Sequence, residues 1–194
     1  MRNILLIALL LPASTVRAGE APLPGAPGWF LAGEGRSYED YEAGVDTKVA
    51  HSGHASAWLR PKVDKPEFGG ALMQIISAKD YAGKRIRFSG WLKTDGVDRS
   101  GLWMRIRPAN ADNSLAADNM LARPLKGSND WTKAEIVLDV AHNADNMIFG
   151  SWVGLKGKAW LDDVKIEVVD RSVPTTDRSP WPTSPRNAGF EERP

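Results

Sequence analysis

Short segments of this chain alternate regularly between apolar and polar residues. The clearest run is RIRFSGWLKT, residues 85–94, in which Ile86, Phe88 and Leu92 share one face of an extended chain. Residues 102–107, LWMRIR, repeat the pattern with leucine, methionine and isoleucine on one face. A period of two residues is that of a half-buried β-strand. Each run therefore predicts a strand with one face in a core.

Similar segments follow one another along the chain, with glycine-containing turns between them. Strands are expected near Trp29–Ala32, Tyr38–Val45, Ala55–Pro61, Ala71–Ile76, Arg85–Thr94, Leu102–Arg107, Trp131–Val140, Met147–Val153 and Ala159–Val169. The segment Ser77–Tyr81 alone favours a helical turn. Many short strands at fairly even spacing indicate an all-β protein, an antiparallel β-sandwich. The lack of long alternating helices argues against a parallel α/β fold.

The first eighteen residues have the pattern of a secretory signal peptide. Arg2 gives a positive start, Ile4–Leu11 form an apolar run, and small residues precede a cleavage site after Ala18. The run is too short to span a membrane. We therefore expect an exported protein, periplasmic or extracellular, with no segment inserted in a membrane.

The rest of the chain is expected to hold one domain between two irregular segments. Residues 19–27 are rich in Pro and Gly and are expected to be a flexible lead, whereas residues 28–170 have the size of one ordinary domain. Residues 171–194 change to a composition typical of a disordered linker or tail. Within them, Asn187–Glu191 is either the start of a second, truncated module or part of a polar tail.

Charge and cysteine content exclude several classes of function. Without Arg2 and Arg17 the 25 basic residues become 23, against 24 acidic ones, so the net charge is about −1. A near-neutral surface gives no electrostatic basis for binding nucleic acid. The chain has no cysteine, which excludes disulfides, thiolate catalysis and cysteine metal sites.

Several motifs occur in the order seen in one known family. They are Tyr41–Gly44, His51–Ser56, Tyr81–Lys84 with the strand after it, Asp130–Lys133, and the closing strand Trp160–Val169. Together they resemble the galactose-binding-like β-jelly-roll domain, the fold of many carbohydrate-binding modules. The middle of the chain looks closest to a version appended to some bacterial transcription regulators and exported proteins. The resemblance implies a jelly-roll β-sandwich that binds carbohydrate, although fold alone does not settle function.

A candidate ligand surface lies on the polar faces of two strands. Trp91 and Trp103 occupy these faces, together with Arg87, Arg105 and Arg107. If the two strands pair as neighbours, these residues form one patch. The flat face of a pyranose stacks on indole, and arginine pairs carboxylates such as that of a uronate. In the alternative interpretation, arginine stems simply cover exposed indoles on a solvated sheet.

A second set of candidates lies in the loop after the arginine-bearing strand. Asp118 and Asn119, with Arg123 nearby, would suit the hydroxyl pairs of a sugar at the rim of the same face. Asp and Asn are equally common turn formers that bond their own backbone. Trp152 is a further candidate for the ligand site, whereas Trp131 and Trp160 are expected to have packing roles.

A structural calcium site is a separate hypothesis. In modules that this chain resembles, calcium often lies between the first core strand and the last, and this implies Glu42 and Asp162 as ligands. The alternation of the closing strand places Asp162 on its apolar side and Asp163 on its solvent side. An inward carboxylate needs a cation, a metal or backbone donors. The alternative is that Asp162 accepts backbone N–H bonds or pairs with Lys or Arg.

Zinc and catalytic sites have little support. His51 and His54 fall in a turn with no third ligand nearby, so we expect solvated histidines. The adjacent Asp162 and Asp163 point to opposite faces of a strand and cannot act together on one glycosidic bond. The chain also lacks the motifs of α/β-hydrolases, P-loop enzymes and zinc proteases.

The sequence thus predicts an exported, non-catalytic binding module whose partner is a carbohydrate or glycan surface. The competing hypothesis is a ligand-free structural or protein-interaction domain of an exported assembly. A hydrolase is a distant third.

Overall fold

The computed structural model describes residues 20–34, 37–111 and 113–177. Ten strands in these ranges form one hydrogen-bonded sheet, and every strand pairing in it is antiparallel. The strands are β1 (Glu20–Pro22), β2 (Trp29–Gly33), β3 (Tyr41–Asp46), β4 (Ser56–Pro61), β5 (Gly70–Ser77), β6 (Arg85–Pro108), β7 (Ala116–Asp118), β8 (Leu125–Asp139), β9 (Ala144–Val153) and β10 (Lys158–Val169). Two short 3-10 helices, η1 (Ser37–Asp40) and η2 (Lys79–Tyr81), complete the described elements. The all-β, antiparallel prediction is confirmed.

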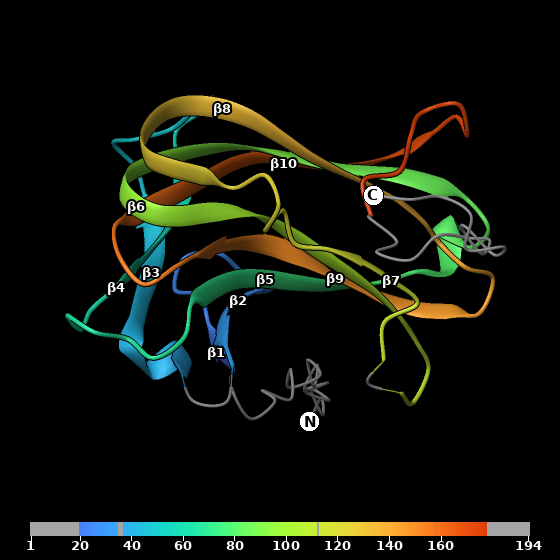
Figure 1. The fold of residues 1–194 in the computed structure, drawn as a ribbon, viewed down its shortest axis with the longest axis horizontal. Coiled ribbons are helices and arrows are strands. Elements are labelled where there is room, and N and C mark those ends of the chain that lie inside the picture. The colour runs from blue at the N-terminus through green and yellow to red at the C-terminus, as the bar shows by residue number, and fades with distance from the viewer. Residues whose placement is uncertain (1–19, 35–36, 112, 178–194) are drawn as a thin grey trace, which may run out of the picture.

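The long strand β6 joins two layers. Its first half, residues 85–92, lies between β8 and β10, whereas its second half, residues 100–108, pairs with β9 and, through residues 104–106, with β7. The upper layer therefore holds β3, β4, β10, the first half of β6 and β8. The lower layer holds β1, β2, β5, β9, the second half of β6 and β7 (Figure 1). The sequence predicted two separate strands here, and the structure has one continuous strand that bends.

Bulges and glycines allow β6 and β8 to bend together. The register between the two strands shifts at several points between Leu92 and Ser100. Gly96 lies next to Val97, the register partner of Gly127, and the two glycines have φ of 61° and 70°, values that L-residues with a side chain rarely adopt. The hydroxyl of Ser128 accepts the Gly96 N–H at 2.9 Å. Bulges increase local twist and bend a strand, so the sheet curls over at this point.

The core lies between the layers and is built from the inward residues of both halves of β6. Ile86, Phe88 and Leu92 from the upper layer are fully buried against partners that include Leu102 and Phe149 of the lower layer. The rings of Phe88 and Phe149 meet across the core with centroids 5.1 Å apart. Full burial of one such side chain contributes about 1.5–3 kcal/mol. The alternation in the sequence therefore identified the core face of both segments correctly.

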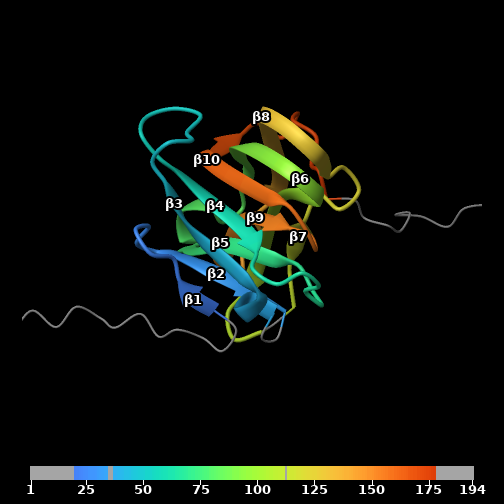
Figure 2. The ribbon, with the colours of Figure 1, turned by 90° about the vertical axis from the view of Figure 1, so that its left-hand side faces the viewer.

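Strands β3 and β4 continue the upper layer around one side of the molecule, toward the viewer in Figure 2. Tyr41 links β3 to the loops before β5 and after β9, because its hydroxyl lies within hydrogen-bond distance of the carbonyls of Phe68 at 3.0 Å and Gly154 at 2.6 Å. Its ring covers Gly70, where a Cβ would come within 2.4 Å of the ring atoms. Burial, aided by the charge of Asp98, raises the pKa of Tyr41 to about 12.

Parts of both segments that were expected to be irregular belong to the fold. Residues 20–22 form β1 against β2, and Leu23 is buried, so the expected flexible lead is wrong for this stretch. After β10, the Thr176 N–H donates to the Val137 carbonyl of β8, and the Val137 N–H donates to the Thr176 hydroxyl. The expected disorder is therefore also wrong for the start of the tail.

The predicted signal peptide and Asn187–Glu191 lie outside the described residues. Within the ranges that the structure covers, no helix is long and apolar enough to cross a membrane.

Candidate ligand-binding groove

A groove of about 750 Å³ runs over the outer face of the lower layer. Its floor is formed by outward residues of β5, β6 and β9, among them Met73, Trp103 and Trp152. One wall comes from the β1–β2 side of the layer, and the other comes from β7 and the loop that follows it. The groove-lining residues are Glu20, Ala32, Gly33, Glu34, Gly69, Gly70, Ala71, Met73, Trp103, Met104, Arg105, Ala117, Asp118, Asn119, Leu121, Trp152 and Val153.

Two tryptophans in the floor each face a glycine on the neighbouring strand. Trp103 of β6 is the register partner of Gly150 in β9, and Trp152 of β9 is the partner of Gly101 in β6. Since residues 101, 103, 150 and 152 share the outer face, the two indoles occupy adjacent rows of the sheet. Glycine inside a strand often marks a place where another group approaches closely. Here the Trp152 indole approaches Gly101, whereas the β5 backbone at Leu72, whose carbonyl accepts the Trp103 hydrogen bond, approaches Gly150.

The indole of Trp103 extends across β9 toward β5. Its Nε1 donates to the Leu72 carbonyl at 3.2 Å. A Cβ at Gly150 would lie 1.9 Å from that same carbonyl oxygen, which therefore lies on the outer side of Gly150. The glycine leaves room for the acceptor, and the hydrogen bond fixes the direction of the half-buried ring.

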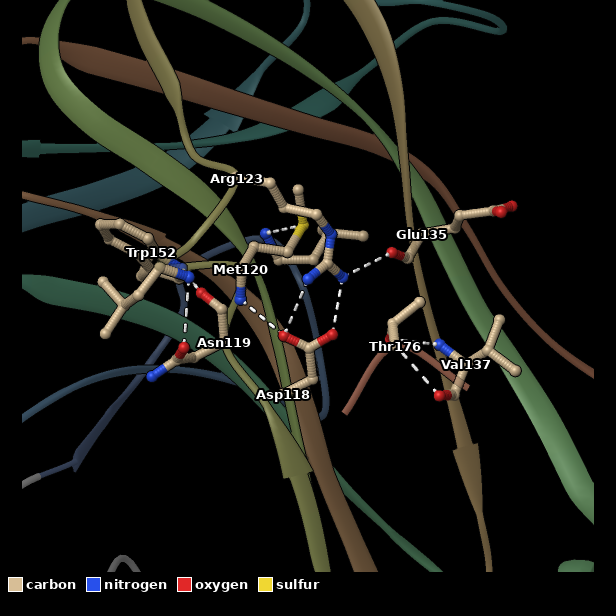
Figure 3. Close-up of polar contacts among 10 residues, drawn as sticks. Asp118, Asn119, Met120, Arg123, Glu135, Val137, Trp152 and Thr176 are labelled. Atoms are coloured by element: carbon tan, nitrogen blue, oxygen red, sulfur yellow. Dashed lines mark hydrogen bonds and ion pairs between the residues drawn. The ribbon is translucent and has the colours of Figure 1, made fainter. Parts of the chain in front are cut away.

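The indole of Trp152 extends in the opposite direction, toward the loop after β7. Its Nε1 donates to the Asn119 carbonyl at 2.9 Å, as Figure 3 shows. A Cβ at Gly101 would lie 3.2 Å from this Nε1 and 3.0 Å from Cβ of Met120. The ring therefore covers Gly101 and is held between β6 and the loop.

An ion pair holds the loop that accepts the Trp152 hydrogen bond. Arg123 binds the carboxylate of Asp118 through both terminal nitrogens, at 2.6 and 3.2 Å, and donates to the Glu135 carbonyl at 3.2 Å (Figure 3). The Asp118 carboxylate also accepts the Met120 N–H at 2.9 Å. Burial raises the pKa of Asp118, but hydrogen bonds from Arg123, Thr176 and the Met120 amide outweigh it, so the pKa lies below its ordinary value. Asp118 thus shapes the wall of the groove, and its oxygens are occupied by these donors.

Arg105 and Asn119 offer exposed polar groups to a ligand on the side of the groove where the indoles lie. Arg105 lies two residues beyond Trp103 on the same face of β6, and no hydrogen bond or ion pair joins its side chain to another described residue. The Asn119 side-chain oxygen accepts the Leu121 N–H at 3.2 Å, and its amide nitrogen is directed away from that bond. Of the residues predicted from the sequence to contact a ligand, the groove brings together Trp103, Arg105, Asp118, Asn119 and Trp152.

The predicted single patch with Trp91 is wrong. Trp91 pairs with Asp162 and Lys133 in the upper layer, so Trp91 and Trp103 lie on opposite outer faces of the sandwich. Arg87 also lies in the upper layer, where it forms ion pairs with Glu135 and Glu167 at 3.2 and 3.1 Å. The physical reason is the bend of β6, which carries residues 85–92 and 100–108 into different layers.

Arg107 shares the outer face of the lower layer but is not a groove residue. Its guanidinium donates to the Ala111 carbonyl at 2.9 Å in the loop after β6. This contact indicates that Arg107 positions that loop.

Around Trp91 the upper layer carries a separate aromatic cluster. The His51 ring stacks on Trp91 with centroids 3.9 Å apart, and Trp131 meets His51 edge-on at 5.8 Å. His51 Nδ1 also lies 2.6 Å from the Asp163 carboxylate. The β3–β4 loop is packed onto the sheet by these contacts, and Trp91 and Trp131 take part in that packing.

The donors proposed for calcium have other partners. Glu42 pairs with Arg60 at 2.6 Å, while Asp162 Oδ2 accepts the N–H groups of His51 and Ser52 at 2.7 and 3.2 Å. No group of three or more His, Asp or Glu residues that could hold a metal occurs in the described part of the chain. Glu42 and Asp162 therefore do not fit a calcium site, and the backbone-donor alternative matches the structure.

The predicted inward direction of Asp162 is also wrong. A β-bulge between Asp162 and Lys165 inserts an extra residue, with Asp163 at φ 50°. The bulge shifts the alternation by one residue. Ile166 therefore packs inward while Asp162 lies opposite Trp91, on the outer face.

Sequence reasoning missed the small residues of the groove floor. Gly101 and Gly150 were not proposed, although each interrupts a strand pattern and each was a signal of close approach. Ala71 and Met73 were assigned to a strand without a face. Leu121 is 51% exposed in the loop after β7, and nothing in its sequence context marks it.

Comparison with known proteins adds one close relative in sequence. No family model matches the chain. The chain is 40% identical over 171 residues to the uncharacterized HTH-type transcriptional regulator YbfP of Bacillus subtilis (strain 168). The aligned region covers 85% of this chain and 57% of the regulator. The chain thus spans little more than half the length of that protein.

Similar solved structures have low sequence identity. The CBM22-1 xylan-binding domain of Xyn10C from Paenibacillus barcinonensis has a TM-score of 0.50 at 16% identity, covering 73% of this chain and 86% of the domain. The C-terminal family 22 carbohydrate-binding module of Clostridium thermocellum Xyn10B has a TM-score of 0.51 at 12% identity, covering 81% and 97%. The enzymatically active domain of the bacteriophage CBA120 tailspike protein 4 has a TM-score of 0.57 at 13% identity, covering 74% and 20%. The chain has the β-jelly-roll fold of the carbohydrate-binding modules.

Proposed function

We propose that this chain is a non-catalytic carbohydrate-binding domain and that the groove of the lower layer holds a short stretch of glycan. The observation that carries the proposal is the pair of indoles in the groove floor. Trp103 and Trp152 come from adjacent strands, and each has its Nε1 hydrogen-bonded to a backbone carbonyl. Side chains fixed before binding lose less conformational entropy when a ligand arrives.

The chemistry of the groove suits a sugar. The C–H face of a pyranose packs on an indole, while hydroxyl groups need donors and acceptors at the edge of the platform. Arg105 and Asn119 supply such groups at the same groove. An apolar floor with a few polar groups at its margin is the usual composition of a small-ligand site.

The comparisons support the same class of ligand by analogy of fold. Solved structures with this fold include xylan-binding domains, and similarity at this level leaves the glycan open. Binding without catalysis is consistent with the state of Asp118, whose oxygens are held by Arg123 and the Met120 amide. A carboxylate so paired is poorly suited to proton transfer.

Export is part of the proposal and rests on the pattern of residues 1–18. Edman sequencing of the protein made in a bacterial host with its own leader should give an N-terminus at Gly19, in the periplasm or medium. A protein retained in the cytoplasm with Met1 would contradict export and would leave the binding proposal standing.

Affinity electrophoresis of the full chain through gels that contain soluble polysaccharides tests the binding. Trp103→Ala and Trp152→Ala should each abolish retardation on any polysaccharide that retards the wild type. Trp91→Ala is the matched control, because Trp91 lies in the half of β6 that belongs to the upper layer, and this variant should still be retarded. Calorimetric melting of each variant verifies that it is folded. A wild type that is not retarded on any polysaccharide would contradict the proposal and favour the interaction-domain hypothesis.

A further inference from the structure

We infer that Arg105 selects glycans carrying a carboxylate, so that the preferred ligand contains a uronic acid residue. The inference rests on the proposed function and names the class of sugar that the groove takes. Its basis is that the side chain of Arg105 is exposed at the groove and has no protein partner within the described ranges.

Arg105 is placed to contact a sugar that stacks on Trp103. The two residues are separated by one position on β6 and share its outer face, so their Cα atoms lie about 7 Å apart along the strand. A pyranose ring is of similar size. A glycan that stacks on the indole can therefore direct the C5 substituent of the stacked residue, or of its neighbour, toward the guanidinium. In a uronic acid this substituent is the carboxylate.

The positions beside Arg105 in the sheet carry no charge. Its register partners are Ala117 in β7 and Ile148 in β9. The arginines of the upper layer differ in this respect. Arg85 is paired with Asp139 at 2.8 Å, and Arg87 is paired with Glu135 and Glu167. The upper-layer arginines have acidic residues on the neighbouring strands, whereas the neighbours of Arg105 are alanine and isoleucine, which cannot form an ion pair.

The carboxylates of the groove do not neutralise Arg105. Asp118 is occupied by Arg123. Glu20 is in β1 and Glu34 directly follows β2, and these strands lie four and three positions from β6 in the sheet. At ~4.8 Å per strand the backbones are about 19 and 14 Å away. No ion pair or hydrogen bond joins Arg105 to either glutamate among the described residues.

A guanidinium binds a carboxylate with two parallel hydrogen bonds, and such charged pairs are stronger than bonds to neutral hydroxyls. A neutral sugar in the same place would leave this capacity unused. We therefore expect a carboxylated glycan to bind at least about tenfold more tightly than its uncharged counterpart.

The experiment is isothermal titration of the full chain with oligosaccharides of xylose, glucose and galactose, each in three forms. The forms are unsubstituted, bearing one uronic acid, and bearing that acid reduced to the alcohol. The reduced form preserves the shape of the ligand and removes its charge. Arg105→Gln keeps a polar side chain, and Arg60→Gln, at an exposed arginine of β4 in the upper layer, controls for net charge.

We expect the acidic form of at least one of these oligosaccharides to bind the wild type about tenfold or more tightly than its reduced form. Arg105→Gln should remove this difference in affinity, and Arg60→Gln should keep it. Equal binding of acidic and reduced forms, with dependence on Trp103, would overturn the inference and leave the proposed function intact. An acid preference that survives in Arg105→Gln would also overturn it. A wild type that binds none of the oligosaccharides and no polysaccharide would overturn both proposals.

Discussion

Trp152 and Gly101 face each other across β9 and β6, and the indole fills the space that a side chain at position 101 would occupy. Trp103 is the register partner of Gly150 on the same two strands, and there the space beside the glycine is taken by the Leu72 carbonyl that accepts the Trp103 hydrogen bond. A strand pair with two such Trp–Gly partners places two wide flat rings on one sheet face without overcrowding it. The glycines are therefore part of the site, although neither offers a group to a ligand.

The first prediction concerns Gly101→Val. Its β-branched side chain would meet Trp152 Nε1 and Met120 Cβ within about 3 Å, so the indole must move and lose its hydrogen bond to Asn119. We expect glycan affinity to fall about as far as in Trp152→Ala, with about 1–3 kcal/mol lost in the free energy of unfolding. Titration calorimetry well below the melting temperature separates the two effects. An affinity within twofold of the wild type would show that the placement of Trp152 is not needed.

The second prediction concerns Gly150→Ala. A Cβ at this position would lie 1.9 Å from the Leu72 carbonyl oxygen, which is backbone of β5 and cannot rotate away. The β5–β9 pairing must therefore distort, and we expect a loss of about 2–4 kcal/mol in urea unfolding. Gly101→Ala is the matched control, since it meets only side chains at 3.0 Å or more and should cost less. The reverse order of the two alanine variants would contradict this account.

The sequence predicted the core faces well because burial imposes a period of two on any strand. Ile86, Phe88 and Leu92 were assigned to one face, and all three are fully buried. The same alternation placed Trp103 and Arg105 on the opposite face of their own segment. These are local properties, and they depend only on the geometry of an extended chain.

The arrangement of those faces in space could not be predicted from the same pattern. Residues 95–101, DGVDRSG, resemble a turn between two neighbouring strands, whereas they continue β6 through the bend. The bend depends on bulges and on Gly96 and Gly127, which lie far apart in sequence. The bulge at Asp163 had the same effect on a smaller scale, since one extra residue reversed the expected direction of Asp162. The alternation of apolar and polar residues in the sequence does not show where a bulge inserts an extra residue into a strand.

The third prediction is an acid limit on glycan binding set by Asp118. The pKa of this carboxyl is lowered in the folded chain, so its ion pair contributes stability above the unfolded-state value of about 3.9 and loses it as pH falls through the folded-state pKa. Protonation weakens the hold on Arg123 and Met120, and with it the loop that orients Trp152. We expect constant affinity from about pH 8 to 5 and a decline below about pH 4.

Asp118→Asn provides the control for that pH profile. It removes the charge at every pH, so its affinity for an uncharged glycan should be lower at neutral pH and should change little on acidification. Both profiles are measured with an uncharged glycan, because a uronate would itself titrate in the same range. Fluorescence titration at several pH values would measure both profiles. A variant with the same acid decline as the wild type would assign the decline to another group.

The last prediction concerns Asp162 and calcium. The carboxylate binds the amides of His51 and Ser52 and thereby holds the β3–β4 loop against β10. Asp162→Ala leaves these two donors without their acceptor, and we expect about 1–3 kcal/mol of destabilisation. Because Glu42 is engaged by Arg60, calcium or EDTA should not change the melting temperature of the wild type. Differential scanning calorimetry measures both effects. A calcium-dependent rise in melting temperature that is lost in Asp162→Ala would restore the metal hypothesis and would require His51 and Ser52 to release the carboxylate.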